Sequence, residues 1–160
     1  EHHRIDAAAF KNRFPELRVV TPPGSRHKVD EVVEVDSTAP EFNDPGVRFL
    51  AVPGTGGEEA ALMVRRLQGT TLVVNDLIGN IRRSSGFGGW VLRRMGLAGD
   101  EAQVPKAVAL LVVHDKHALA AQLKRWAEVP DLRRIIVSHG EIIDSKPAAV
   151  LHELADSLDE

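Results

Sequence analysis

Cysteine is absent from the 160 residues of this chain. Its absence excludes disulfide bonds, thiolate metal ligands and a cysteine nucleophile together. It also fits a reducing compartment, so we expect a cytoplasmic protein. Long hydrophobic runs are missing too: "AVALLVV" at 107–113 falls short of the roughly 18 residues that span a bilayer. No signal peptide is visible, and we expect no membrane partner.

An excess of charge of either sign is also missing. The chain has 20 Lys and Arg against 23 Asp and Glu, a net charge of −3. No global field therefore attracts nucleic acid or an anionic membrane. Arginine pairs occur at 65–66, 82–83, 93–94 and 133–134, spread along the chain. We expect no nucleic-acid partner, and binding through these pairs is the weaker alternative.

The composition that remains is that of a soluble globular domain. Apolar residues make up 43% and charged residues 27%, both ordinary values. The length suits one domain over residues 1–160. In the first half, patterns predict a helix at 7–14 after Asp6, short strands at 17–20 and 32–35, helical turns at 25–32, a strand at 47–52, and a hairpin of 59–67 and 70–76 around "QG".

The second half is predicted to be mostly helical. The expected elements are a helix from Trp90, an amphipathic helix at 116–129 capped by Asp115, a strand at 133–139, and a last helix from Ser145 with Pro147 in its first turn. Residues 105–113 are open between helix and strand, and Pro105 at their start favours a helix. The strand "RRIIVSH" has a continuous apolar centre, which predicts burial on both faces. Strands mixed with helices indicate α/β layers.

Two strands end on polar residues that could carry chemistry. "TLVVNDLIGN" runs from a strand into Asn75-Asp76, and "RRIIVSHGEII" runs into His139. Carboxylate and imidazole are metal ligands. The alternatives are a turn role for Asp76 and a partly buried, hydrogen-bonded His139. His27, His114, His117 and His152 have charged neighbours, and we expect them at the surface.

Three segments together resemble the later motifs of the metallo-β-lactamase superfamily. They are "FLAVPGTGGEEAALMV", "TTLVVNDLIGN" and "RRIIVSHGEII", in the family's order and spacing, while "EHHRIDAAAF" stands where the early histidine-rich motif would fall. The resemblance implies an α/β fold, an αββα-type sandwich of mixed β-sheets flanked by helices. It implies that this chain lacks the N-terminal strands, and we expect residues upstream of Glu1.

The resemblance also implies a metal site and a reaction. Its ligands would be His2, His3, Asp76 and His139, holding one zinc, iron or manganese ion that activates water for hydrolysis of a small-molecule substrate. Thr55 stands where the Pro-Gly-His turn of the family has a ligand, and the first motif lacks the family spacing. One metal or none is therefore expected. The alternative is a non-catalytic relative that acts as a binding or structural module. Asp6 is open between a site role and helix capping.

Overall fold

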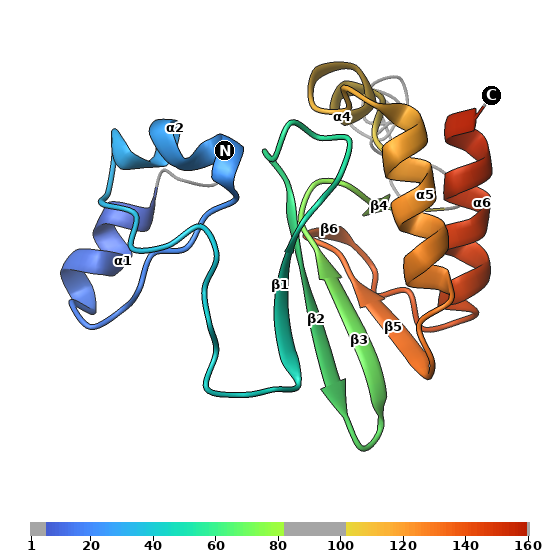
Figure 1. Ribbon diagram of the computed structural model, residues 1–160, viewed down its shortest axis with the longest axis horizontal. Coiled ribbons are helices and arrows are strands. Elements are labelled where there is room, and N and C mark those ends of the chain that lie inside the picture. The colour runs from blue at the N-terminus through green and yellow to red at the C-terminus, as the bar shows by residue number, and fades with distance from the viewer. Residues whose placement is uncertain (1–5, 82–101, 160) are drawn as a thin grey trace, which may run out of the picture.

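The computed structural model describes residues 6–81 and 102–159, so the helix predicted from Trp90 lies outside the described residues. Figure 1 shows the arrangement of the elements. In chain order they are α1 (Ala7–Arg13), η2 (Pro23–Ser25), α2 (Arg26–Asp30), β1 (Val47–Ala51), β2 (Ala60–Arg66), β3 (Gly69–Val74), β4 (Gly79–Asn80), α4 (Lys106–Leu111), α5 (Lys116–Ala127), β5 (Leu132–Ile136), β6 (His139–Gly140) and α6 (Pro147–Asp159).

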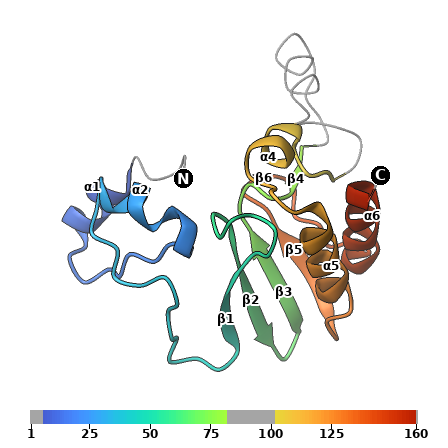
Figure 2. The same ribbon diagram turned by 45° about the horizontal axis from the view of Figure 1, so that its top comes forward.

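A mixed four-stranded sheet forms the centre of the fold. Its order is β1-β2-β3-β5, with antiparallel pairs up to β3 and a parallel pair between β3 and β5. The predicted hairpin is confirmed: Arg66 lies opposite Gly69, so two residues make the turn. A second, two-stranded sheet pairs β4 with β6 in parallel. Figure 2 shows both sheets beside α5 and α6.

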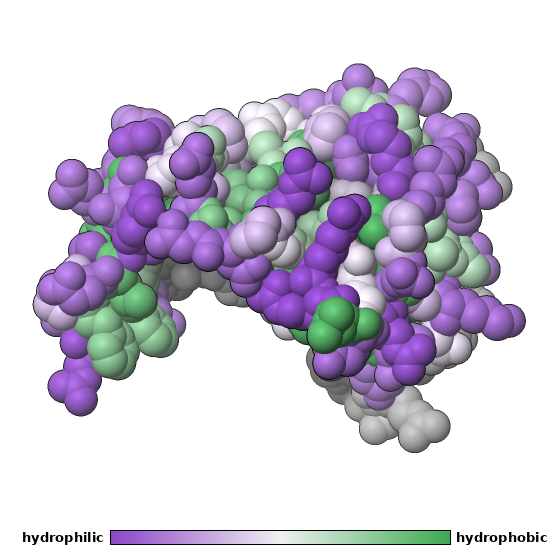
Figure 3. All heavy atoms as spheres, turned by 60° about the horizontal axis from the view of Figure 1, so that its bottom comes forward, coloured by the Kyte–Doolittle hydropathy of each residue, from purple (hydrophilic) through white to green (hydrophobic). Residues whose placement is uncertain are grey.

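The strand β5 is buried on one face only, which corrects the prediction of burial on both. Ile135 is fully buried, but Ile136 is half-buried and Arg133 and Arg134 are exposed. The reason is that the core closed by α5 and α6 lies on the face of Ile135. β5 pairs with β3 on one side and makes the isolated Ile135–Ile143 bridge on the other. Figure 3 brings the hairpin end of the sheet forward, and hydrophilic side chains gather over it.

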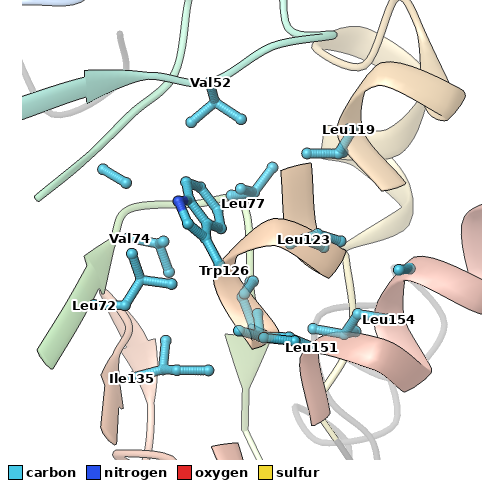
Figure 4. Close-up of a cluster of buried hydrophobic side chains, with 14 of the residues drawn as sticks. Val52, Leu72, Val74, Leu77, Leu119, Leu123, Trp126, Ile135, Leu151 and Leu154 are labelled. Carbon is cyan, nitrogen blue, oxygen red and sulfur yellow. The ribbon is translucent and has the colours of Figure 1, made fainter. Parts of the chain in front are cut away.

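The core lies between the central sheet and the pair of helices α5 and α6. Figure 4 shows Trp126 and Leu123 of α5 beside Leu72 of β3 and Leu151 of α6, and all four are buried. The predicted cap of α5 is confirmed, since Asp115 Oδ1 accepts a hydrogen bond of 2.9 Å from the backbone N–H of Ala118. The N–H groups of His114 and Asp115 donate to the Gly54 carbonyl and so join the start of α5 to the loop after β1.

The N-terminal segment contains helices but no strand among its described residues. The strands predicted at 17–20 and 32–35 are wrong: Val20 makes a single isolated bridge with Ser37, and 32–35 form a turn and an extended stretch. Asp6 occupies the N-cap position of α1 without a side-chain cap bond. The segment contacts the sheet through loop 53–59, where the Gly24 N–H donates to the Gly57 carbonyl over 2.8 Å.

None of the described helices is both long and apolar enough to cross a membrane.

Candidate metal centre

Three loops converge at one edge of the central sheet. β1 and β3 each run antiparallel to β2, and β5 runs parallel to β3. The carboxyl ends of β1, β3 and β5 therefore lie at the same edge, where the chain continues into 52–59, 75–81 and 137–143. Loops at such an edge commonly carry function on a rigid scaffold.

Asp76 and His139 meet at this edge, as predicted from their places after two strands. His139 Nε2 lies 3.0 Å from Asp76 Oδ1, and the side chains are 49% and 19% exposed respectively. The parallel pairing of β3 with β5 explains the meeting, because it carries both chains to the same edge in register. A half-exposed imidazole beside a more buried carboxylate forms an accessible pair of donors.

Neighbouring polar residues hold the two loops together. Ser138 Oγ donates to Asn75 Oδ1 over 2.7 Å and thereby links the two strand ends. Asn80 is fully buried, and its Nδ2 donates to the Glu141 carbonyl over 2.8 Å, while its own carbonyl accepts the Glu141 N–H at 3.0 Å. These contacts fix the backbone on both sides of His139. Sequence reasoning gave no role to Ser138 or Asn80, although Ser138 directly precedes a predicted ligand, and it expected Glu141 to be solvated rather than to support the site.

Thr55 serves the backbone of its own loop. It is fully buried, its hydroxyl donates to the Val52 carbonyl over 2.8 Å, and it accepts the Glu59 N–H at 3.4 Å. The hydroxyl therefore bridges the backbone of Val52 to that of Glu59 across the turn. This arrangement explains in structural terms why Thr stands where the resemblance leads one to expect a histidine ligand.

His114 reaches the same edge from the start of α5. Its N–H and that of Asp115 both donate to the Gly54 carbonyl, over 2.7 and 3.1 Å. Its ring lies against Gly56, where a Cβ would come within 2.8 Å of Nδ1. The predicted surface position of His114, and of His27, His117 and His152, is confirmed. The placement of His114 beside the site loops was missed, because its bond to Gly54 joins segments that are 60 positions apart.

Comparison with known proteins gives a fold. No protein-family model matches the sequence, and no curated protein matches it. Among solved structures, a metallo-β-lactamase from Pontibacter korlensis superposes with a TM-score of 0.54 at 13% identity, over 92% of this chain and 61% of that one. A metallo-β-lactamase from Erythrobacter litoralis, solved with β-mercaptoethanol in its active site, gives 0.52 at 16% identity, over 93% and 61%.

This chain has a metallo-β-lactamase-like fold. It spans 61% of the length of each of these two metallo-β-lactamases. The predicted α/β class and the mixed sheet flanked by helices are thereby confirmed. At these identities the likeness concerns the fold, and the chemistry of the site must be argued from this chain's own residues.

The donors at the edge of this metallo-β-lactamase-like fold fit a cation in type and spacing. Zinc binds His nitrogen and Asp oxygen at about 2.1 Å, so two donors on one tetrahedral ion lie roughly 3.4 Å apart. The 3.0 Å between Nε2 and Oδ1 is a direct contact at hydrogen-bond distance, about 0.4 Å below this separation, so a bound ion would have to replace that contact. Catalytic zinc takes three protein ligands, and the described residues contain no cluster of three or more His, Cys, Asp or Glu suited to a metal. His2 and His3 lie outside the described residues, and their role as ligands stays a prediction.

Proposed function

We propose that the protein is a metal-dependent hydrolase that acts on a small-molecule substrate. Asp76 Oδ1 and His139 Nε2 would hold one divalent cation, with His2 or His3 completing the ligand set. The observation that carries the proposal is the 3.0 Å approach of an imidazole and a carboxylate from two strand ends. Asp76 and His139 would hold the ion, and the chemistry that such an ion would supply is the activation of water for hydrolysis at neutral pH.

The chain's own residues prepare this edge in two ways. The hydrogen bond between Ser138 and Asn75 ties the ends of β3 and β5, so the two donors stay in register. The paired backbone around Asn80 and Glu141 holds β6, the short strand that begins at His139. Outer groups that orient ligands typically change metal affinity or activity by about 10- to 100-fold.

A binding or structural module is the second candidate, and Thr55 favours it. Its buried hydroxyl is engaged with its own loop, and a hydroxyl is in any case a poor substitute for imidazole as a zinc ligand. A site reduced by one ligand would bind a cation weakly. Under this reading the fold is retained while hydrolysis is lost.

Hydrolysis assays separate the two candidates. The protein is loaded in turn with zinc, ferrous iron and manganese, and offered an ester, a thioester, an amide and a phosphodiester. We expect metal-stimulated hydrolysis of at least one class. His139→Ala and Asp76→Asn should each reduce it by at least about 100-fold, because a lost ligand costs more than a lost outer contact.

His27→Gln is the matched control, since His27 on α2 is 94% exposed and pairs only loosely with Glu31 at 4.0 Å. Its activity should equal that of the wild type. Absence of hydrolysis with every metal and substrate would favour the binding module. Activity unaffected by both site substitutions would place the reaction elsewhere in the molecule.

A further inference from the structure

The opposite end of the central sheet contains a cavity of about 580 Å³. The β2–β3 hairpin, residues 65–70, forms one side of it, and residues 130–133 at the start of β5 form the other. This is the end that Figure 3 brings forward, where hydrophilic side chains gather. β3 runs from this cavity toward Asp76 over six residues, and at about 3.3 Å per residue the two places are roughly 20 Å apart.

The cavity gathers positive charge that the sequence distributes along the chain. Arg65 and Arg133, 68 positions apart in sequence, both line it. Within 6–81 and 102–159, neither guanidinium has a hydrogen-bond or ion-pair partner. Arg66 differs, because it is paired with Asp44 at 2.7 Å and donates to the Arg65 carbonyl. Asp131 is the acidic residue in the lining, which therefore holds three arginines, two of them unpaired, against one carboxylate.

The pairing of β3 with β5 contains a β-bulge beside the cavity, at Arg133. Between the pairs Thr70–Leu132 and Thr71–Arg134 the register of β3 and β5 shifts, which leaves Arg133 as an extra residue. Such bulges are rare in parallel pairs and redirect a side chain.

Gly69 permits the close approach of these two segments. It has φ +117, and a Cβ there would come within 2.8 Å of the Asp131 carbonyl and 3.1 Å of Arg133 Cβ. Asp131 itself has φ 55, a conformation that non-glycine residues rarely adopt. Three neighbouring residues with unusual backbone geometry, Gly69, Asp131 and Arg133, therefore form part of the cavity wall.

We propose that this cavity binds a small ligand that carries phosphate groups. Guanidinium groups match phosphate oxygens in a bidentate fork, and two of them lie unpaired here. The volume falls in the range of small-molecule pockets, about 300–1,000 Å³. Leu67, fully exposed at 103% in the hairpin turn, offers apolar surface beside the charges for the organic part of the ligand. The site is separate from Asp76 and His139 and does not depend on the hydrolase.

Calorimetric titration of the whole chain with pyrophosphate at low ionic strength tests the proposal. We expect saturable binding with one ligand per chain. Arg65→Gln and Arg133→Gln should each weaken it about 10- to 100-fold, because a hydrogen bond to a charged group has that effect on affinity. ADP should bind more tightly than pyrophosphate if Leu67 contacts the organic part, and adenosine alone should not bind.

Arg134→Gln is the matched control. It removes the same charge from the next residue of β5, which is exposed but does not line the cavity. It should change the affinity by less than about threefold, as expected for a screened surface charge. His139→Ala should leave the affinity unchanged. Thermal unfolding shows whether each variant is folded. We expect all of them to be folded, because the substituted side chains are exposed.

Three results would overturn the proposal. One is no binding at about 1 mM pyrophosphate. Another is a loss of pyrophosphate affinity from Arg134→Gln as large as that from Arg133→Gln, which would mean that general surface charge, rather than a specific site, attracts the ligand. The third is single-stranded oligonucleotide binding that is tighter than that of pyrophosphate and falls steeply with salt, which would make the cavity part of a nucleic-acid surface.

Discussion

At the scale of single residues, Thr55 shows how one side chain can be read differently in sequence and in structure. The resemblance to metallo-β-lactamases presents it as a ligand that is missing. The structure presents it as a buried hydroxyl that closes its own loop by bonding to Val52 and Glu59. Both readings agree that it does not hold a metal in this arrangement.

The structural role of Thr55 predicts the effect of two substitutions. Thr55→Val keeps the shape and removes the hydroxyl, which leaves buried backbone groups without their partner, so unfolding should become easier by about 1–3 kcal/mol. Thr55→His should destabilise further, because the site is fully buried and has no room for an imidazole. Urea denaturation measures both.

Thr71→Val is the control for these two substitutions. Thr71 lies half-buried on β3, and valine suits a strand, so its unfolding free energy should stay within about 0.5 kcal/mol of the wild type. If Thr55→Val behaves like this control, the hydroxyl of Thr55 does not support the loop.

The approach of Asp76 to His139 could be predicted from sequence because each lies within three residues of the end of a predominantly apolar strand. A strand's place in a sheet decides where its end lies. Because β3 and β5 are neighbours and run parallel, their carboxyl ends lie side by side. The placements of Asn80 and His114 were not predictable in this way. Their contacts, to Glu141 and Gly54, join segments 61 and 60 positions apart, and no local pattern records such contacts.

At the scale of elements, local sequence patterns predicted the elements that depend on residues close to one another in the chain. The hairpin of β2 and β3 closes over two residues, and α5 has its cap and apolar face within one segment. The strands predicted at 17–20 and 32–35 failed because a strand requires a partner. Val20 finds only one bridge, with Ser37, and Val35 is buried without joining a sheet.

Trp126 on α5 yields a prediction about the core. Its ring is buried, and its Nε1 has no acceptor among the residues described. Trp126→Ala should cost about 3–5 kcal/mol of stability through the cavity it leaves. Trp126→Phe should cost no more than about 1 kcal/mol, because losing the unpaired donor offsets the smaller ring. Denaturant unfolding compares the three proteins, and an equal loss for Phe and Ala would mean that the indole N–H is bonded.

The contact between α5 and α6 should depend on pH through an exposed ion pair. Lys124 Nζ lies 3.1 Å from Asp159 Oδ2. Its hydrogen bond holds the pKa of Asp159 below the usual 3.8, and the same bond raises the pKa of Lys124 above 10.5. The ion pair therefore stabilises the folded protein over the pH range in which Asp159 is ionised and Lys124 is protonated. It is lost as the pH falls through the lowered pKa of Asp159, or rises through the raised pKa of Lys124.

Asp159→Asn tests this dependence. At neutral pH the variant should have a slightly lower urea midpoint than the wild type, and salt should reduce the difference because exposed pairs are screened. The difference should vanish well below pH 3.8. A difference that persists undiminished in acid would assign the effect to packing of α6.

At the scale of the whole molecule, the central sheet places two sites at its opposite ends. At one end Asp76 lies beside His139, and at the other Arg65 and Arg133 line the same cavity. The sequence predicted the first because both residues follow strands. The second was not predictable. The arginine pairs look scattered until the end of β2 and the start of β5 come to the same end of the sheet, and the shift of register at Arg133 has no sequence signature.

The fold class also follows from the whole chain. Mixed strands and helices predicted α/β layers, and the order of three motifs predicted the metallo-β-lactamase-like arrangement that two solved structures match. Of the four predicted ligands, Asp76 and His139 lie together, and metal binding by any of the four stays a prediction. His2 and His3 stay predictions, because the structural description begins at Asp6.

Metal content tests the central claim most directly. The protein and its variants are loaded with zinc, ferrous iron or manganese, desalted, and measured by mass spectrometry of the elements. The wild type and His27→Gln should each retain about one ion per chain of at least one metal, while Asp76→Asn and His139→Ala should retain close to none, because metal binding requires each of the two ligands. A wild-type content near zero with all three metals, or a content unchanged in both variants, would contradict the account.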